Sequence, residues 1–285
     1  MSSREAWEEY FQPGTIDADG NGVLRNRPGL TDPAALDALE ARLVRIRATQ
    51  LWVNQDYIPR TYDAAHLQAI HQHLFKDLYD WAGQFRTVPM SKNHQTFDTP
   101  GTEQFTQRLE HVTATVQGTD WQRQDKLGFA ETLSEVYANI NRAHPFREGN
   151  GRTGRIFLEH VAQLSPHYQL DLTRVDRMEW NFASVRSAPA PETTAVRPEQ
   201  MRGVFWGATV GSRPGDPESI PLTRAEELTR SLSRGEKLRN LIEPSEAAQA
   251  MRKILQEQDD APVAGQHQHD RARTPPQQRG PRPAR

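Results

Sequence analysis

One short segment concentrates the residue types from which a phosphate-binding site is built. Residues 144–155 read HPFREGNGRTGR and bring a histidine, a carboxylate, an amide, three glycines and three arginines together. Gly149, Asn150 and Gly151 predict a turn that leads directly into a helix. The first N–H groups of a helix have no partners inside it and carry the positive end of its dipole. The segment therefore predicts a cradle for phosphate groups.

The charged side chains of this segment suit the same ligand. Arg152 and Arg155 lie three residues apart on the expected helix, so both belong to one face and can bind neighbouring phosphates. Glu148 precedes the turn, and magnesium commonly binds one or two carboxylates together with phosphate oxygens. His144 ends the preceding helix, where it can take a proton from an incoming hydroxyl. We therefore predict a magnesium ligand in Glu148 and a general base in His144.

The elements that must position these residues are mostly helical. Thr31-Asp32-Pro33 predicts a helix start, with a capping residue followed by proline at the first helical position. Residues 84–97 change to a shorter period, which suits a β-hairpin and is the only β structure expected. Apolar spacing predicts helices over 33–51, 64–81, 102–116, 123–143, 153–164, 174–187 and 198–207.

The C-terminal part of the chain differs in composition from the rest. Glycine and proline at 211–221 predict a linker, so the folded domain is expected to cover 1–210. Residues 222–257 predict a short polar helical extension, and 258–285 a disordered basic tail. Only 35% of the chain is hydrophobic, in keeping with a segment that does not pack.

Charge and composition exclude several classes of protein. The net charge is −2, and the last fifteen residues carry five arginines, which leaves about −7 on the rest. Nucleic-acid binders usually carry a basic face, so we expect no nucleic-acid partner for the body of the chain. The chain has no cysteine, no apolar signal segment and no stretch approaching the roughly 18 apolar residues of a membrane span. We expect a protein that is made in the cytoplasm.

The segment HPFREGNGRTGR resembles the signature of the Fic (filamentation induced by cAMP) family over its full length. VLRNRPGL at 23–30, the run from Ile70 to Phe97 and NINRA before His144 are also similar to Fic domains of type IV secretion effectors and conjugation-linked toxins. The resemblance covers residues 10–205. It implies an all-α fold: a Fic helical core with one β-hairpin flap, followed here by a helical extension and a disordered tail.

The resemblance also implies roles for individual residues. His144 matches the general base, Glu148 the Mg2+ ligand and Phe146 an anchor in the core. The implied reaction is attack of a Tyr, Ser or Thr hydroxyl on the α-phosphate of ATP, which transfers AMP to a target protein. Residues 87–97 resemble the flap that binds the target backbone as an added strand. The implied nucleotide-binding residues are Ser91, Lys92, Gly149, Asn150, Gly151, Arg152, Thr153, Gly154 and Arg155.

Two further features of the family bear on regulation and on the choice of reaction. Fic relatives with lysine at the position of Gly151 phosphorylate, whereas glycine is typical of adenylylation. Many relatives carry an inhibitory helix, [S/T]-x-x-x-E-[G/N], whose glutamate pairs with the arginine matched by Arg155. Only Thr223–Glu227 has this spacing, and Leu228 follows it. We therefore expect inhibition by a separate small antitoxin, with a degenerate internal helix as the alternative, and no de-adenylylation.

Other readings remain open at this stage. The same site could transfer UMP or a phosphoryl group, or the motif could belong to a non-catalytic binding module that uses residues 222–257. The protein could be a toxin or an effector exported by type IV secretion, with the basic tail as its signal or merely a soluble end. The target protein, its modified residue, the antitoxin and the oligomeric state are not specified.

Two candidate metal sites are rejected. His66, His71 and His73 have no carboxylate partner at helical spacing, so we expect packing or surface roles for them. Residues 17–22 imitate the start of a calcium loop, but Pro28 stands at its twelfth position, where a bidentate glutamate is required.

Overall fold

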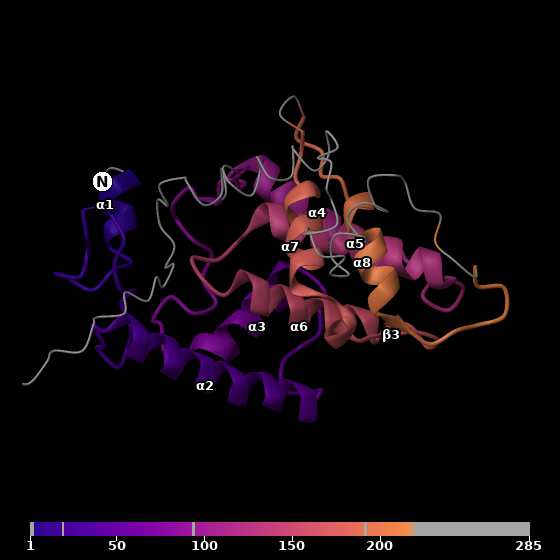
Figure 1. Cartoon of the computed structure of the whole chain (residues 1–285), viewed down its shortest axis with the longest axis horizontal. Coiled ribbons are helices and arrows are strands. Elements are labelled where there is room, and N and C mark those ends of the chain that lie inside the picture. Colours follow the sequence, from indigo (N-terminus) through magenta and orange to yellow (C-terminus); the bar gives the residue numbers. More distant parts are fainter. Residues whose placement is uncertain (1–2, 19, 93–94, 191–192, 218–219, 221–285) are drawn as a thin grey trace, which may run out of the picture.

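The structure is a computed structural model that describes residues 3–18, 20–92, 95–190, 193–217 and 220 (Figure 1). The predicted helical extension at 222–257, the tail at 258–285 and the segment Thr223–Glu227 lie outside the described residues. The division of the chain into these parts therefore stays a prediction.

Within the described residues the molecule consists of eight α-helices, one 3-10 turn and two pairs of very short strands. The helices are α1 (Ser3–Glu8), α2 (Pro33–Val53), α3 (Ala64–Phe75), α4 (Glu103–Gly118), α5 (Lys126–Ala143), α6 (Asn150–Ala162), α7 (Arg177–Arg186) and α8 (Glu199–Ala208), and the 3-10 turn is η1 (Leu172–Arg174). β1 (Ser91–Lys92) pairs antiparallel with β2 (Gln95–Thr96), and β3 (Gln169–Leu170) pairs antiparallel with β4 (Thr209–Val210). The predicted all-α fold with a hairpin is confirmed.

Five of the eight described helices start in the same way. Each begins after a side chain that accepts a hydrogen bond from a backbone N–H of the first turn, which satisfies a group that the helix itself cannot. These capping residues are Asp32, Asp63, Thr102, Asp125 and Asp176. Two helices lack such a bond: α8, whose N-cap is Pro198, and α6, whose N-cap is Gly149 at φ 81°. The helix of the predicted phosphate turn thus begins without a side-chain cap.

The helix α5 is the central element of the fold. It packs against α4, α6 and α8, while α6 also packs against α3, and α2 lies along α3 (Figure 1). Phe129, Leu133 and Val136 on α5 are completely buried. Complete burial of one such side chain contributes about 1.5–3 kcal/mol. The helix that ends just before His144 is therefore held by the core along its length.

The helix α3 ends at Phe75, earlier than the predicted end at Trp81. The backbone N–H of Arg27 donates to the Leu78 carbonyl at 2.7 Å, and its Nη1 donates to the Lys76 carbonyl at 2.8 Å. A continued helix would use these two carbonyls for its own N–H groups. The N-terminal segment therefore competes with the helix, which the periodicity of residues 64–81 could not reveal.

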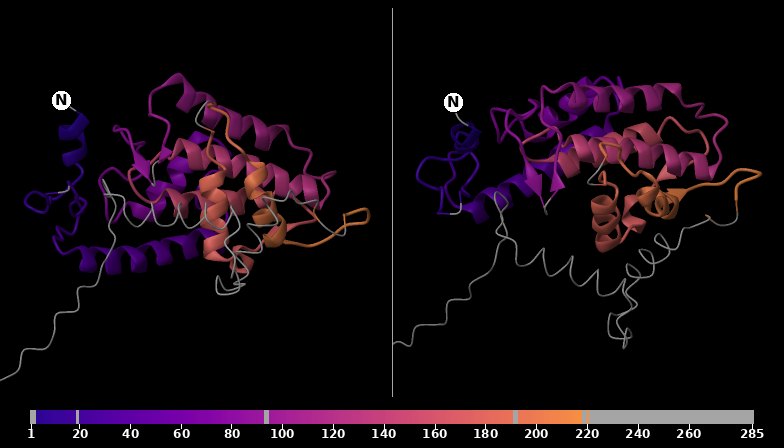
Figure 2. Two further views of the ribbon diagram at one scale, coloured as in Figure 1. Left: turned by 45° about the horizontal axis from the view of Figure 1, so that its top comes forward. Right: turned by 90° about the horizontal axis from the view of Figure 1, so that it is seen from above.

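The β structure differs from the prediction in two respects. Among the described residues, Ser91 pairs with Thr96 and Lys92 with Gln95, and the Phe97 N–H also donates to the Met90 carbonyl at 3.0 Å; β3–β4 is a second strand pair. Strands of two residues are too short to show a period of two in the sequence. In both views of Figure 2 the flap strands lie toward the end of the molecule that carries α1.

The segment predicted as a linker contacts the folded core where the structure describes it. Asp216 accepts hydrogen bonds from the backbone N–H groups of Lys126 at 3.0 Å and Arg213 at 2.8 Å, and from the Tyr168 hydroxyl. These bonds attach residues 213–216 to the beginning of α5.

Candidate functional site

The loop between α5 and α6 is closed by one of its own side chains. The Asn150 Oδ1 accepts from the Phe146 N–H at 2.8 Å, and the Asn150 Nδ2 donates to the Phe146 carbonyl at 2.7 Å. Phe146 is fully buried and its ring stacks on His71, with ring centroids 3.9 Å apart. The expected anchor is thus confirmed. Both ends of the Asn150 amide thus bind the backbone of the loop, and the nucleotide contact of Asn150 stays a prediction.

His144 lies at the junction of α5 and this loop. It caps α5 in the left-handed conformation, at φ 43° and ψ 59°. The following Pro145 disfavours a helical conformation at His144, which gives a local reason for the helix to end there. The imidazole stacks on the Phe97 ring, with centroids 3.8 Å apart and an interplanar angle of 6°. The predicted base is therefore packed directly against the flap arm.

Arg86 binds the main chain on both sides of this contact. Its guanidinium donates to the His144 carbonyl at 2.8 Å, to the Val88 carbonyl at 2.5 Å, to the Ala143 carbonyl at 3.2 Å and to the Asp98 carbonyl. Arg86 is 1% exposed, and burial lowers its pKa to about 10 despite the nearby Asp98 carboxylate. One buried cation thus joins the end of α5 to both arms of the flap.

The beginning of α6 has the shape that the phosphate prediction requires. A Cβ on Gly149 would lie 2.4 Å from the Phe75 ring, so this left-handed position accepts only glycine. Gly151 is exposed, and a Cβ there would meet nothing within 4 Å. The N-terminus of α6 is therefore open on the side of Gly151 and closed on the side of Phe75.

Glu148 meets the requirements of a magnesium ligand that binds together with phosphates. Its side chain is 39% exposed, and its Oε1 accepts from the Gly149 N–H at 2.9 Å. One accessible carboxylate at a phosphate cradle suits Mg2+, which usually keeps waters and phosphate oxygens as its other ligands. The described residues contain no group of three or more His, Asp or Glu side chains that could bind a metal ion.

The two arginines predicted to share one face of α6 contact different elements. Arg152 pairs with Glu40 of α2 at 2.6 Å and with Glu148 at 3.3 Å, whereas the Arg155 guanidinium lies 5.2 Å from the ring centroid of Trp180 on α7. Burial opposes the charge on Arg152, but the carboxylates of Glu40 and Glu148 outweigh it and raise the pKa of Arg152. The first arginine is thus pre-oriented, while the second is exposed.

Thr153 and Gly154 do not reach the open side of the helix. Thr153 is 1% exposed, and its N–H donates to the Gly149 carbonyl at 2.9 Å. Gly154 is also buried, with the Ile140 side chain 3.7 Å from the position of a Cβ. Both residues are therefore turned into the core, and their contact with the nucleotide stays a prediction. Ser91 and Lys92 form β1 of the flap, and their nucleotide contact stays a prediction.

His71 supports the motif loop from α3, which sequence reasoning missed. Its Nδ1 accepts from the Gly83 N–H at 2.8 Å, so its Nε2 carries the proton and donates to the Glu148 carbonyl at 3.0 Å. Burial lowers the pKa of His71 to about 4. His66 and His73 are also buried, so the packing role expected for the three histidines is confirmed and the surface alternative is wrong.

Other supporting residues also carried no signal in the sequence. Glu40, Arg86, Asp98 and Arg142 lie far along the chain from the partners they bind, apart from the contacts of Arg86 within the flap. Charged residues at such positions look like ordinary surface residues until the fold brings their partners close.

No helix within the described part of the chain combines the length and apolar character needed to cross a bilayer.

Comparisons with known proteins agree on one family. The model of the Fic/DOC family matches residues 61–162. A curated relative from Sinorhizobium fredii, named probable protein adenylyltransferase y4lH, is 34% identical over 170 residues, which cover 59% of this chain and 84% of the relative. The protein adenylyltransferase VbhT of Bartonella schoenbuchensis is 34% identical over 188 residues. That match covers 63% of this chain but only 36% of VbhT, so the chain spans about a third of that relative.

A solved structure supports the same assignment. The N-terminal Fic domain of a VirB-translocated Bep effector protein from Bartonella quintana, solved with bound ADP, has a TM-score of 0.57 and 25% identity. The alignment covers 72% of this chain and 96% of that domain.

Proposed function

The chain belongs to the Fic/DOC family, and on that premise we propose that it transfers AMP from ATP to a Tyr, Ser or Thr hydroxyl of another protein. The chain is then an enzyme, a protein adenylyltransferase. One observation carries the proposal: the packed imidazole of His144 and the open, glycine-capped N-terminus of α6 flank a single closed loop. A base and a phosphate cradle are thereby fixed to one another.

The residues divide the work of the reaction as follows. The N-terminus of α6 and the pre-oriented Arg152 bind the triphosphate. Glu148 would hold magnesium, which would neutralise charge on the phosphates. The target oxygen forms a bond to the α-phosphorus, the bond from that phosphorus to the bridging oxygen breaks, and pyrophosphate leaves. The proton of the hydroxyl passes to the imidazole of His144, which as a general base contributes about 10²–10⁴-fold to the rate.

Gly151 supports transfer of the nucleotidyl group over transfer of the γ-phosphoryl group. A Cβ at this position would meet open space, so a lysine could reach the bound phosphates from there, whereas glycine adds no charge. UMP or phosphoryl transfer by the same site is the alternative within enzymes, and a non-catalytic Fic binding module is the alternative outside them.

The proposed partners follow from the flap and from Arg155. A target protein would add its backbone as a strand beside 87–97, where β1 and β2 leave edge positions. A small antitoxin protein would cover the exposed Arg155. We further propose that the protein is made in the cytoplasm and acts as a toxin or as an effector translocated by type IV secretion. The likeness to the VirB-translocated effector of Bartonella quintana motivates the latter.

Labelling of lysate proteins tests the proposed function. Purified protein, magnesium and bacterial lysate are incubated with ATP labelled either at the α- or at the γ-phosphate, and with α-labelled UTP. We expect protein label from α-labelled ATP only, and a loss of about 10²–10⁴-fold in His144→Ala. His167→Ala is the matched control, because His167 is an exposed histidine whose ring contacts the Gln122 carbonyl and the neighbouring Tyr168 ring. Label that persists in His144→Ala would overturn the mechanism.

A further inference from the structure

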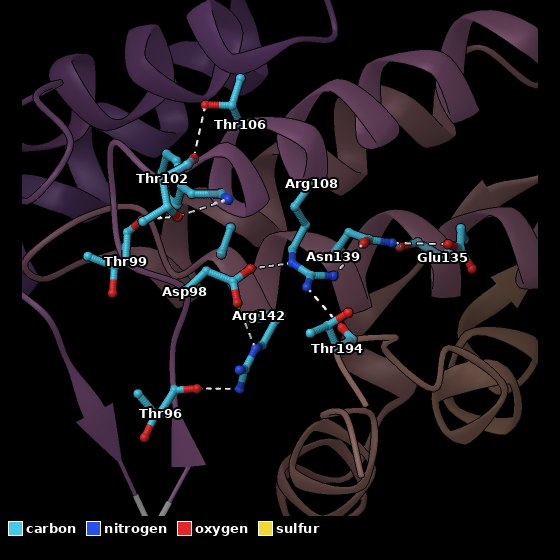
Figure 3. Close-up of polar contacts among 12 residues, drawn as sticks. Thr96, Asp98, Thr99, Thr102, Thr106, Arg108, Glu135, Asn139, Arg142 and Thr194 are labelled. Atoms are coloured by element: carbon cyan, nitrogen blue, oxygen red, sulfur yellow. Dashed lines mark hydrogen bonds and ion pairs between the residues drawn. The ribbon is translucent and has the colours of Figure 1, made fainter. Parts of the chain in front are cut away.

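The arm of the flap that leads back to the core is fastened to the last turn of α5 by one side chain. Arg142 Nε donates to Asp98 Oδ1 at 2.9 Å, and its Nη1 donates to the Thr96 carbonyl. The backbone is joined as well, because the Asp98 N–H donates to the Arg142 carbonyl at 3.2 Å. Figure 3 shows Arg142 extended between Asp98 and Thr96. Arg142 thus binds the flap arm on both sides of Phe97.

Phe97 is the residue whose ring covers the imidazole of His144. It is 7% exposed, and the two rings are nearly parallel at 3.8 Å. Since Thr96 and Asp98 are both bound to Arg142, the backbone of Phe97 can shift only if these bonds break. Arg142 itself precedes His144 by two residues on the same chain. Few bonds therefore separate the residue that holds Phe97 from His144, which fixes the orientation of the two rings relative to each other.

The carboxylate at the centre of this arrangement is itself held from a second side. Asp98 is 1% exposed at its side chain, and its Oδ2 accepts from Nε of Arg108 on α4 (Figure 3). Arg108 also donates to Asn139 Oδ1 at 3.1 Å and to the Thr194 carbonyl at 3.1 Å. A buried carboxylate is stable when it is paired and its remaining lone pairs accept hydrogen bonds. Arg108 thus keeps Asp98 paired even without Arg142.

The chemistry of arginine explains why this position requires that residue. A planar guanidinium presents several donors in a fixed geometry, so it can bind the Asp98 carboxylate and the Thr96 carbonyl together. A lysine at position 142 would keep the charge, but its three N–H donors leave a single nitrogen and do not match the two separate nitrogens, Nε and Nη1, that Arg142 uses.

We propose that Arg142 is a positioning residue for the reaction: it holds Phe97 against the imidazole of His144 and thereby fixes the target-binding flap relative to the base. This inference rests on the proposed function. Residues 91–98 set the position of a target backbone that pairs with the flap. The last turn of α5, to which Arg142 attaches these residues, also sets the position of His144. The distance from the target hydroxyl to the imidazole is set by that shared attachment.

The position of His144 relative to Phe97 can be measured without any activity. In the wild type, the Phe97 ring current shifts the imidazole proton resonances of His144 upfield, and these resonances are assigned by their loss in His144→Ala. We expect Arg142→Met, and more weakly Arg142→Lys, to reduce this upfield shift. Because Arg108 still pairs with Asp98, both variants should fold. Unchanged His144 resonances in Arg142→Met would overturn the inference.

The rate of label transfer gives the second readout. With α-labelled ATP and bacterial lysate, we expect Arg142→Met to lower the rate at saturating ATP by about 10- to 100-fold, as for a small misplacement of reacting groups. The ATP concentration for half-maximal rate should change less than about twofold, because the phosphate cradle is untouched. A merely structural role would instead change ATP binding and rate together, and that result would count against positioning.

A matched control separates this effect from the loss of any arginine on the fold. Arg202 on α8 pairs with Glu131 on α5 at 3.3 Å, about 20 Å along that helix from His144. Arg202→Met should leave both the His144 resonances and the labelling rate as in the wild type. If the wild type itself gives no label that depends on His144, the proposed function fails, while the resonances still decide whether Arg142 holds the stack.

Discussion

The phosphate loop and the flap lie on either side of His144, and they are supported in opposite ways. The loop at 144–150 is closed from within, since Asn150 binds the backbone of Phe146 four residues earlier. The paired part of the flap contains only two residues in each strand. Its arms are instead held by arginines, among them Arg86 and Arg142, that bind its main chain and Asp98.

The loop is thus stabilised by contacts between residues close in sequence, whereas the flap is stabilised by side chains from distant parts of the chain. The loop needs particular residues at Gly149, where a Cβ would meet Phe75, and at Asn150, whose amide binds the Phe146 backbone. The flap needs few particular residues of its own, because backbone carbonyls accept the hydrogen bonds. A substrate cradle that never changes and a docking strand that meets varied targets would be expected to differ in this way.

The largest effect is expected when the common support of flap and base is removed. Arg86→Met leaves four carbonyls without their guanidinium donor, and an unsatisfied buried group costs about 1–3 kcal/mol. We expect a loss of about 4 kcal/mol in the free energy of unfolding, measured by urea denaturation, because some carbonyls will bind water instead. The free energy of unfolding of Arg86→Lys should lie between those of the wild type and Arg86→Met.

Arg123→Met, which removes an arginine with an 88% exposed side chain, serves as the control and should change stability little. A wild-type midpoint for Arg86→Met would show that the flap and the end of α5 do not depend on this side chain, which breaks the contrast drawn above.

A smaller effect is expected inside the loop. Gly149→Ala forces alanine into a left-handed conformation, at about 1–2 kcal/mol, and presses its Cβ against Phe75, at about 1–3 kcal/mol. We expect thermal unfolding to report a combined loss of about 3 kcal/mol. Gly151→Ala is the matched control, since its Cβ meets open space and alanine favours a helix by about 0.5–1 kcal/mol. Equal stability of the two variants would contradict the assigned loop geometry.

The smallest effect concerns pH, and it involves His71, which supports the phosphate loop from α3. Burial lowers the pKa of His66 and of His71 to about 4, and that of His160 to about 3. Because these values lie below the ordinary value near 6.5, the unfolded chain binds protons first as the pH falls. The contribution of His71 to stability should therefore be constant well above pH 6.5 and decline below it by at most about 1.4 kcal/mol per pH unit, or about 2 kcal/mol by pH 5.

Urea denaturation from pH 7.5 to 5 measures this slope. His71→Asn keeps an acceptor for the Gly83 N–H and cannot titrate, so its slope should be shallower than that of the wild type. Equal slopes for the two proteins would show that protonation of His71 does not contribute to the pH dependence of stability.

The helices and the motif could be predicted because their causes are local. Asp32 before Pro33 predicts the start of α2, and the structure begins the helix there. In the motif, Pro145 predicts that α5 ends at His144, and Gly149 predicts a left-handed turn before α6. Both predictions use only the backbone preferences of neighbouring residues. The sequence by itself therefore determined the all-α fold, the place of the predicted base and the open end of α6.

The tertiary structure decided what these elements contact. Beyond the end of α3, Arg27 from the N-terminal segment binds the Lys76 and Leu78 carbonyls, and Thr153 is buried in the core. Arg142, Asp98 and Phe97 are ordinary residue types in an unremarkable stretch until the fold brings them beside His144. Hydrogen bonds and ring stacking between distant segments leave no periodicity and no motif, because each depends on a distance of a few ångströms that only the folded chain defines.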